Sequence, residues 1–566
     1  MAGLEDLGKV ISTDILIVGG GIGGLVAGIR AKETDDSVDV LIAEKQTIGY
    51  SGKAPKGAAV WMVLEPGVHD VDKFMDYHVK NIGFGLEDQE LLYEYARDTY
   101  AAVQQIEEWG VKMCRTPDGK RYDLIANPAT GLWGMVGGDL HMLLPLRKRA
   151  RKLGAKFMNK IALIDLLKQG DRVVGAVGFN LISGEFHIIK AKATILANGG
   201  CNFRLRKMWA AGTGDGIAAA YRAGAEMRNV EFSNSSPDLL TINEGGADPR
   251  YIFNALGENI SKKYMPQIQP DTPLSIMLGV EKEVREGRGP CYCDVSERPP
   301  NDMSMLGNVM SWDRPNNLKS WGKMMEKANK YGPPPQKKQE ITIRVHSECA
   351  PVRVDHEMRT SLPGLWAIGD TSQSGSAWTG ANPPPALKRG SGILCAAMSA
   401  MRAAPSAVRY ALSASSPEAD YSQASELKER IYAPMGRKEK ALLPSDMVLR
   451  LQEAVAPVKY SIRRSGPRME EALSIVKEVK EKLPELWARD GHGLCLCHEV
   501  AAMEVCAEMY FVASIMRTES RGTLFREDYP ERDDKNWLKW IIVKQEDGKM
   551  KLSTEPVPMD KYKFKL

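Results

Sequence analysis

The fold is decided near the N-terminus by the stretch Ile15-Leu16-Ile17-Val18-Gly19-Gly20-Gly21-Ile22-Gly23-Gly24. Its first four residues form an unbroken apolar run that is short enough to be one buried strand. Gly19, Gly21 and Gly24 then have the spacing G-x-G-x-x-G, and alanine and leucine residues continue to Ala31 as in a helix. The pattern therefore predicts a strand, a tight glycine turn and a helix in direct succession.

This turn has the chemistry of a dinucleotide site. The first glycine permits the tight bend, the second lets the backbone approach a pyrophosphate, and the third lets the helix pack on the strand. The helix N-terminus adds free N–H groups and a positive dipole end. A second apolar strand, residues 38–43, ends at Glu44, about twenty residues past the turn, where a ribose hydroxyl needs an acceptor. The alternative is a glycine-rich turn without a ligand, which would leave three consecutive glycines unexplained.

Composition and length describe an ordinary globular protein. The chain has 566 residues, of which 43% are hydrophobic and 26% are charged, and this length corresponds to about three to four domain-sized units. A net charge of +4 is too small to indicate a nucleic-acid partner. We find no apolar stretch of about 18 residues, so no transmembrane helix is expected. The first residues lack the basic segment and apolar core of a secretory signal, and the predicted location is cytoplasmic.

Nine cysteines are scattered along the chain, an odd number that does not suggest a disulfide framework. Two C-x-C pairs stand out, Cys291/Cys293 and Cys495/Cys497. Zinc and iron–sulfur sites usually use C-x2-C spacing and four ligands. We therefore predict that these cysteines are small buried residues and that the chain carries no metal and no iron–sulfur cluster of its own.

The remaining pattern divides the chain into four segments. Helices are indicated in 71–110, 143–153, 274–285 and 318–330, and strands between 160 and 197. Residues 240–340 are rich in proline, glycine and methionine, which we interpret as a cap inserted into the nucleotide fold. The predicted segments of this α/β protein are 1–240 and 341–405 for the nucleotide-binding domain, 241–340 for an α+β capping domain, and 406–566 for a C-terminal helical domain with a short polar tail.

In this order the motifs resemble the fumarate reductase/succinate dehydrogenase flavoprotein superfamily over nearly the whole chain. The matching stretches are Gly19–Gly24 with Glu44, Ser51–Gly57, Ala197–Gly200, Thr213–Gly216, Glu286–Pro290, Leu362–Asp370, Arg517–Gly522 and Phe525–Asp534. The resemblance implies a Rossmann-like FAD-binding domain and an FAD-dependent oxidoreductase. The FAD-binding residues that it implies are Gly19, Gly21, Ile22, Gly23, Gly24, Glu44, Lys45, Ser51, Gly52, Gly57, Ala58, Ala197, Gly199, Thr213, Asp215, Gly369, Asp370, Ser391, Gly392 and Ile393.

The resemblance also predicts how FAD is held and how it exchanges electrons. In members of this superfamily with covalent FAD, the flavin is attached to a histidine directly after the serine that matches Ser51. This chain has Gly52 at that position. We therefore expect non-covalent FAD. The chain has one complete dinucleotide fingerprint and none for NAD, so electrons are expected to pass through an iron–sulfur or other carrier protein. A small-molecule substrate is expected and a nucleic-acid partner is not, while the oligomeric state stays open.

The residues that carry fumarate chemistry in the superfamily are not matched. The proton-delivering arginine upstream of the Glu-Gly-Arg-Gly motif corresponds to Pro273, which has no proton to donate. The substrate arginine after Gly-Ala-Asn is displaced, because Gly380-Ala381-Asn382 is followed by three prolines and Arg389 comes later. The sequence therefore disfavours fumarate or succinate as the substrate.

A more specific resemblance is to the alpha subunit of adenylylsulfate reductase, through Gly85–Asp88, Glu107–Gly110, Gly175–Phe179 and His346–Ala350. His346 matches the active-site histidine of that family, and Asp139 stands where the family has an active-site glutamate. However, residues 233–240 hold no arginine where its sulfate-binding arginine belongs. We therefore favour a relative that acts on another small, anionic substrate.

Four residues are candidates for the chemistry at the flavin. His346 follows an expected strand, and an imidazole can orient or protonate an oxyanion near neutral pH. Asp139 lies in a glycine loop, where a carboxylate also suits a turn. Arg353 and Arg389 could clamp a carboxylate with their planar fork, or they could form ion pairs in solvent. Three functions stay open: an FAD-dependent redox subunit with its own substrate, an adenylylsulfate-type reductase, and a flavin electron-transfer subunit without a substrate.

Overall fold

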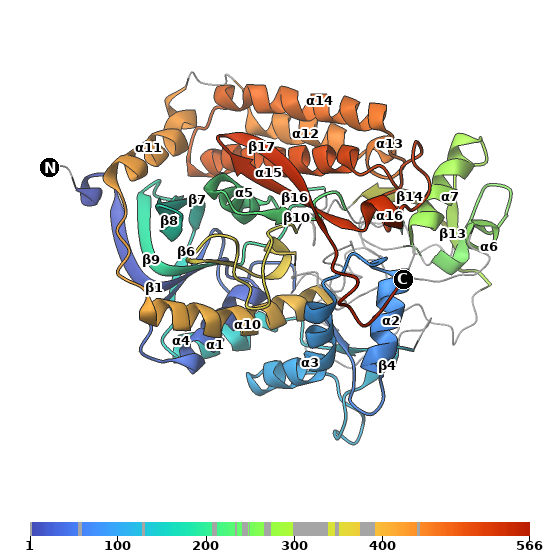
Figure 1. Ribbon diagram of the computed structural model, residues 1–566, viewed down its shortest axis with the longest axis horizontal. Coiled ribbons are helices and arrows are strands. Elements are labelled where there is room, and N and C mark those ends of the chain that lie inside the picture. The colour runs from blue at the N-terminus through green and yellow to red at the C-terminus, as the bar shows by residue number, and fades with distance from the viewer. Residues whose placement is uncertain are drawn as a thin grey trace, which may run out of the picture.

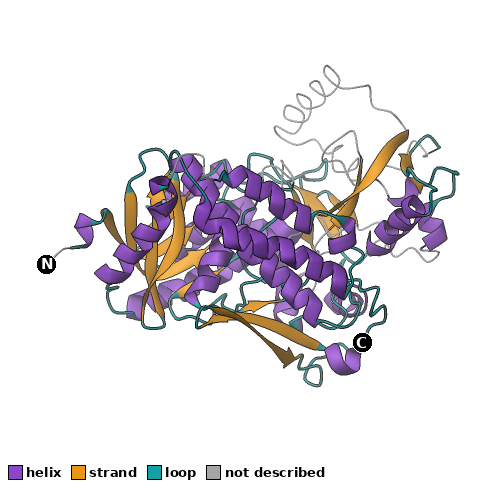
Figure 2. Ribbon diagram, turned by 90° about the horizontal axis from the view of Figure 1, so that it is seen from above, coloured by secondary structure: helices purple, strands orange, loops and turns teal. Residues whose placement is uncertain are grey.

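The computed structural model describes residues 3–54, 59–126, 131–205, 212–232, 235–239, 247, 249–264, 273–297, 338–345, 350–373, 391–437 and 442–566. Figure 1 shows a large sheet at the left and centre, a layer of long helices above it, and a small cap at the right. Seen from above in Figure 2, the cap lies at the end of the molecule opposite the N-terminus. The predicted α/β architecture, with an inserted α+β cap and a C-terminal helical domain, is confirmed.

A seven-stranded sheet forms the core of the nucleotide-binding domain, in the order β6-β2-β1-β9-β8-β7, with β15 paired to β9. The strands β6, β2, β1, β9 and β15 are parallel, and β7 and β8 extend the sheet antiparallel. Their bounds are β1 Lys9–Val18, β2 Val40–Glu44, β6 Lys156–Asn159, β7 Ile161–Gln169, β8 Arg172–Asn180, β9 Phe186–Leu196 and β15 Leu365–Ala367. Parallel strands covered on both faces need apolar side chains throughout, which explains the unbroken runs of β1 and β2.

Helices cover this sheet on both sides. α1 (Ile22–Thr34), α4 (Leu143–Lys152) and α10 (Ser391–Ser413) lie below the sheet in Figure 1, and α5 (Asp215–Ala223) lies above it. The predicted division at residue 406 needs correction, because α10 runs through it with Pro405 inside the helix. α10 packs along α1, so the whole helix belongs to the nucleotide-binding domain.

A smaller domain flanks this core beside α2 (Val71–Asn81) and α3 (Gln89–Glu108), the two helices predicted between residues 71 and 110. A three-stranded sheet lies with them, made of β3 (Val60–Val63), β5 (Gly134–Gly137) and β4 (Leu124–Ala126). The helix predicted at 143–153 corresponds to α4.

The cap has its own four-stranded sheet, in the order β11-β14-β13-β12. Its elements are β11 Ser235–Leu239, η2 Pro249–Tyr251, β12 Ile252–Phe253, α6 Ile260–Tyr264, α7 Pro273–Arg285, β13 Tyr292–Asp294 and β14 Lys338–Val345. Because β14 pairs with both β11 and β13, we infer that the cap extends from 235 to 345 rather than from 241 to 340. The helix predicted at 318–330 lies outside the described residues.

A buried carboxylate holds the cap together. Glu283 accepts hydrogen bonds from Arg288 Nε at 2.6 Å and from Asn254 Nδ2 at 2.7 Å, and the Tyr264 hydroxyl also donates to it. The Arg288 hydrogen bonds hold the pKa of Glu283 well below its usual range. The Glu-Gly-Arg-Gly motif therefore has a structural role in this cap.

The C-terminal part is helical and ends in a β-hairpin. Its elements are α11 Tyr421–Tyr432, η4 Ala433–Gly436, α12 Pro444–Val455, α13 Val458–Ser461, α14 Gly466–Lys482, η5 Leu483–Glu485, α15 Gly491–Met516, α16 Asp534–Trp537, β16 Lys539–Glu546 and β17 Lys549–Pro556. The predicted helical domain also contains a β-hairpin, in which β16 and β17 pair across Asp547-Gly548, and β16 also pairs with β10 (Met227–Arg228). The last strand of the chain thus completes a sheet at the start of the cap.

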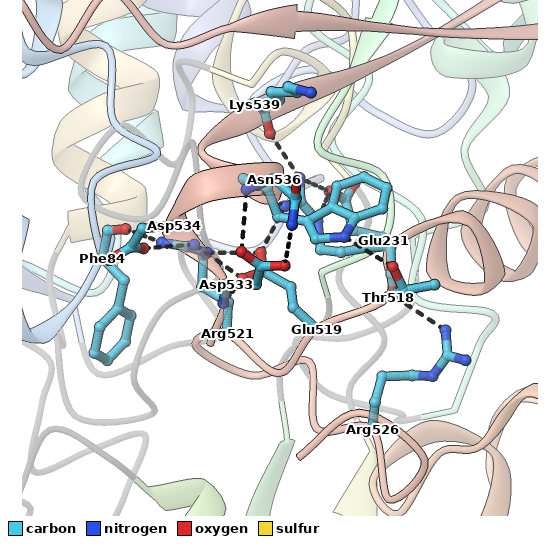
Figure 3. A network of polar contacts seen from close by, with 12 residues as sticks. Phe84, Glu231, Thr518, Glu519, Arg521, Arg526, Asp533, Asp534, Asn536 and Lys539 are labelled. Atoms are coloured by element: carbon cyan, nitrogen blue, oxygen red, sulfur yellow. Dashed lines mark hydrogen bonds and ion pairs between the residues drawn. The ribbon is translucent and has the colours of Figure 1, made fainter. Parts of the chain in front are cut away.

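A buried ion network joins the C-terminal part to the base of the cap (Figure 3). Arg517 Nε donates to Glu231 Oε1 at 2.9 Å, and Arg517 Nη1 donates to Glu519 Oε1 at 2.8 Å. Arg521 pairs with the same Glu519 and donates to the Phe84 carbonyl at 2.5 Å. Arg464 Nη1 donates to the Glu231 carbonyl at 2.9 Å. All five side chains have less than 3% exposure, so Glu231, four residues before β11, is fixed from two sides.

Candidate functional site

The three fingerprint glycines lie in the turn between β1 and α1, where the spacing predicts them. A Cβ on Gly24 would lie 1.8 Å from the Gly19 carbonyl oxygen, so this glycine lets α1 pack closely on the turn. Gly19 has φ +120° and closely approaches Ala197. A Cβ on Gly21 would meet only the Gly52 Cα, at 3.8 Å. The backbone at Gly21 is therefore open on one side, and Ile22 and Gly23 begin α1 directly behind it.

Glu44 is held at the tip of β2, beside the glycine turn. Its carboxylate accepts a hydrogen bond from the Gly20 N–H at 2.6 Å and another from the Gln46 N–H at 2.8 Å. Two backbone donors fix the orientation of this buried carboxylate. Each oxygen keeps a further lone pair, so the geometry suits an acceptor for ribose hydroxyls.

The Ser51–Gly52 loop closes over the same turn. The Ser51 hydroxyl is buried and has no hydrogen-bond partner among the described residues. Gly52 has φ +81° and lies against Gly21. A buried hydroxyl without a partner beside an open glycine backbone indicates a polar ligand at this place.

Lys45 is the centre of a charged cluster next to Glu44. Its Nζ lies 3.0 Å from Thr213 Oγ1, 2.5 Å from Asp215 Oδ2 and 2.7 Å from Glu499 Oε1. Burial alone would lower the pKa of Lys45, but the charges of Asp215 and Glu499 outweigh it and raise this pKa. The cluster ties β2 and the start of α5 to α15 of the C-terminal part.

The carboxyl ends of β1, β9 and β15 meet at this edge. The Ala197 N–H donates to the Val18 carbonyl at 2.8 Å, and Thr371 Oγ1 donates to the Gly199 carbonyl at 3.1 Å. Asp370 forms an ion pair of 2.9 Å with Lys53. Gly369 follows β15, and Gly392 and Ile393 lie in the first turn of α10. Ligands of open α/β sheets bind at such an edge, and the residues present fit a dinucleotide.

Family comparisons agree with this geometry. The FAD binding domain family matches residues 14–253, and the family described as fumarate reductase flavoprotein C-term matches residues 450–566. The chain belongs to the fumarate reductase/succinate dehydrogenase flavoprotein superfamily. It is an FAD-binding flavoprotein and an FAD-dependent oxidoreductase. The predicted cofactor and the predicted superfamily are confirmed.

Individual relatives are distant but cover nearly the whole chain. The fumarate reductase flavoprotein subunit of Mycobacterium tuberculosis is 26% identical, over 97% of this chain and 98% of its own length. A quinol-fumarate reductase structure has a TM-score of 0.82 at 19% identity, over 98% of this chain and 99% of that one. The adenylylsulfate reductase of Archaeoglobus fulgidus has a TM-score of 0.78 at 24% identity, over 97% of both chains. The flavoprotein therefore shares one fold with both kinds of enzyme.

Two predicted catalytic residues lie among the described residues, and the structure does not bring them together. Asp139 follows β5, and its Oδ1 accepts the His141 N–H at 2.8 Å, as in an Asx turn. Arg353 pairs with Glu226 at 3.0 Å and with Glu555 of β17 at 2.8 Å. The guanidinium of Arg353 thus serves the contact between the C-terminal hairpin and the base of the cap.

The other predicted residues include some that the structure does not describe. His346, Arg389, Gly57 and Ala58 lie outside the described residues, and for Ser391 only the backbone is described. The strand that leads to His346 is described, however. Val345, the last residue of β14, pairs with Ser235 at the base of the cap.

The structure also adds a residue that the sequence did not indicate. Glu499 on α15 binds Lys45 although 454 residues separate them. A local pattern contains no signal for such a pair. Cys495, one turn earlier on α15, is buried, and burial raises the pKa of its thiol.

Within the described part of the chain, no three His, Cys, Asp or Glu side chains are grouped to hold a metal ion. Both C-x-C pairs are buried and free of disulfides. None of the described helices has the length and apolar character needed to cross a bilayer.

Proposed function

We propose that this chain is the flavoprotein component of a redox enzyme that moves two electrons between non-covalently bound FAD and a small anionic substrate. FAD supplies the two-electron chemistry, and the chain binds it, orients it and covers it with the cap. The observation that carries the proposal is the junction between cap and nucleotide-binding domain. There β14 ends at Val345, immediately before His346 in the sequence, and pairs with β11, which begins four residues after the fixed Glu231.

Gly52 supports the non-covalent state. Glycine offers no nucleophile to the flavin, and Gly52 has φ +81°, a conformation that a residue with a side chain adopts only under strain. The test is acid precipitation of the purified yellow protein. All flavin is expected in the supernatant, identified as FAD by its chromatographic retention. A pellet that keeps its yellow colour after washing would contradict the proposal.

An electron-carrier partner is the second component of this proposal. The sequence has one dinucleotide fingerprint, which FAD occupies, so a second nucleotide cofactor has no equivalent turn. Relatives from several organisms are named as subunits, among them the fumarate reductase flavoprotein subunit of Mycobacterium tuberculosis. We therefore propose that electrons enter or leave through a separate iron–sulfur or comparable carrier protein.

Fumarate is a poor candidate for the substrate. Pro273 is the first residue of α7, and its ring nitrogen carries no N–H that could deliver a proton. Adenylylsulfate is the second candidate, since the chain shares the stretch Glu107–Gly110 with that reductase. In this structure, however, Trp109 Nε1 donates to Glu33 and Glu107 pairs with Arg115, so this stretch serves packing.

The decisive experiment is anaerobic reoxidation of the flavin. Holoenzyme is reduced with dithionite, the excess is removed, and the return of flavin absorbance is followed with adenylylsulfate, fumarate and a panel of other small oxoanions and carboxylates. One compound is expected to reoxidise the flavin far faster than buffer, and fumarate is not. If fumarate reoxidises it at ordinary enzymatic rates, the assignment of Pro273 is wrong. If no compound does so and only a carrier protein reacts, the chain is an electron-transfer subunit without its own substrate.

A further inference from the structure

Helix α4 carries an unusual concentration of positive charge on the outside of the nucleotide-binding domain. Its sequence ends Arg147-Lys148-Arg149-Ala150-Arg151-Lys152. Lys148, Arg151 and Lys152 are exposed and Arg147 is half-buried. We call these four residues, Arg147, Lys148, Arg151 and Lys152, the basic ridge. No ion pair joins any of them to a carboxylate among the described residues.

Two other cations near the ridge, Arg149 and Lys156, do form ion pairs with carboxylates. Arg149, on the same helix, pairs with Glu33 of α1 at 2.6 Å. Lys156, just after the helix, pairs with Asp39 at 2.8 Å. The acidic side chains next to α4 are thus used by other cations, and the basic ridge keeps its charge.

Repulsion between the charges of the basic ridge lowers the stability of α4. Arg147 and Arg151, and likewise Lys148 and Lys152, are four residues apart, where like charges repel by about 0.2–0.5 kcal/mol per pair. The helix dipole favours cations in the last turn, which accounts for Arg151 and Lys152. It does not account for Arg147 and Lys148 one turn earlier, so the ridge has a cost that folding alone does not explain.

The ridge lies next to the cofactor loop. The Arg147 side chain packs on Gly49, since a Cβ there would lie 2.5 Å from Arg147 Cδ. Its guanidinium lies 5.9 Å from the ring centre of Tyr50, which is 61% exposed. The next residue, Ser51, has a buried hydroxyl without a hydrogen-bond partner among the described residues, and Gly52 after it lies against Gly21 of the glycine turn. A protein seated on the ridge therefore contacts the outer side of the loop whose inner side faces the flavin nucleotide.

We propose that the basic ridge on α4, with Tyr50, is the docking surface for an acidic one-electron carrier protein that exchanges electrons with FAD. This inference rests on the proposed function and adds to it the place and the charge of the partner. Each carrier delivers or accepts one electron, so two encounters, with protons from water, convert FAD into its reduced form or back. Unpaired cations attract an acidic partner over several ångströms and raise its association rate.

The probe is a reduced plant-type ferredoxin, an acidic iron–sulfur protein with a potential near about −400 mV, low enough to reduce a flavin. Stopped-flow absorbance follows the bleaching of FAD in the holoenzyme and gives a second-order rate constant. The test variant is K148Q/R151Q/K152Q, which removes three exposed charges. The control variant is K535Q/K549Q/K551Q, which removes three exposed charges around the C-terminal hairpin.

At low salt the test variant is expected to react about tenfold or more slowly than wild type, within the range of electrostatic steering, and the control variant within about twofold of wild type. The difference should vanish near 1 M salt, where the Debye length is about 3 Å. Equal rates for the test and control variants would overturn the proposal. A second result would also overturn it: wild type sediments with phosphatidylserine vesicles, the test variant does not, and both react with ferredoxin at the same rate. The basic ridge would then be a membrane-binding surface.

Dithionite titration of the same preparations distinguishes a failure of the docking surface from a failure of the proposed function. If dithionite reduces the bound FAD in every variant but ferredoxin rates do not differ, only the docking surface is wrong. If the preparations bind no reducible FAD, the proposed function itself fails.

Discussion

Three neighbouring glycines allow the cofactor site to be separated from the fold. Gly21→Ala adds a methyl group whose nearest protein atom is the Gly52 Cα at 3.8 Å, so the fold is unaffected. Gly24→Ala places its methyl 1.8 Å from the Gly19 carbonyl oxygen, far inside the closest real contacts of about 3.0 Å. Gly23→Ala meets Ala396 and Ile368 at 3.5 Å, an ordinary contact, and alanine gains about 1 kcal/mol of helix propensity over glycine.

Each variant therefore has its own expected pattern. Gly24→Ala forces α1 away from the turn and is expected to lose about 1–3 kcal/mol, as overpacked sites do. Gly21→Ala is expected to keep wild-type stability without FAD, while its FAD affinity falls by about tenfold or more, equivalent to about 1.4 kcal/mol. Gly23→Ala is expected to match wild type in FAD affinity and to be up to about 1 kcal/mol more stable.

The assays are urea unfolding of the apoprotein and FAD titration by quenching of flavin fluorescence. The geometry of the turn would be refuted if Gly21→Ala bound FAD as tightly as wild type. It would also be refuted if Gly24→Ala and Gly23→Ala unfolded at the same urea concentration, because the predicted clash would then be absent.

Three further predictions concern charged groups. Arg517→Met leaves Glu231 and Glu519 buried with less countercharge, and its free energy of unfolding in urea is expected to fall by about 3–5 kcal/mol. The control Arg532→Gln, at an exposed ion pair, is expected to change this free energy little. Equal losses in the two variants would argue against the network. Glu499→Gln removes one charged partner of Lys45. Its free energy of unfolding is expected to fall by about 1.5–3 kcal/mol, the range for hydrogen bonds to charged groups, and an unchanged free energy would contradict the prediction. The Asp88 carboxylate, 3.7 Å from His356 Nε2, raises the pKa of His356 to about 9. The stabilising effect of the charged His356 is therefore complete below about pH 6.5 and is lost as the pH rises through 9. The difference in melting temperature between wild type and His356→Gln should shrink over that range, and a constant difference would contradict the assignment.

The nucleotide-binding core could be predicted from the sequence because its signals are local. The strand, the glycine turn, α1 and β2 with Glu44 are consecutive, and each has its own physical reason. The boundaries of the cap could not be predicted in the same way. Residues 341–345 look like a returning strand of the large sheet, and only pairing with β11 and β13 assigns β14 to the cap.

Other errors have similar causes. The predicted boundary at residue 406 lies inside α10, which continues through Pro405 because packing along α1 outweighs the lost hydrogen bond. The C-terminal hairpin did have a signal, the turn Asp547-Gly548 between the apolar run 540–543 and the alternating residues 549–552. The Lys45–Glu499 pair had none, since charge pairs between distant segments depend on the completed fold.

The attachment of the C-terminal hairpin has a consequence for synthesis. Met227 and Arg228 are synthesised long before β16, the strand with which they pair. Glu231 is likewise synthesised long before Arg517, so a nascent chain can complete the glycine turn well before the base of its cap is set. Nonsense mutations between the codons for Glu499 and Arg517 would thus yield polypeptides that keep the glycine turn and the Lys45–Glu499 pair but cannot fix the base of the cap.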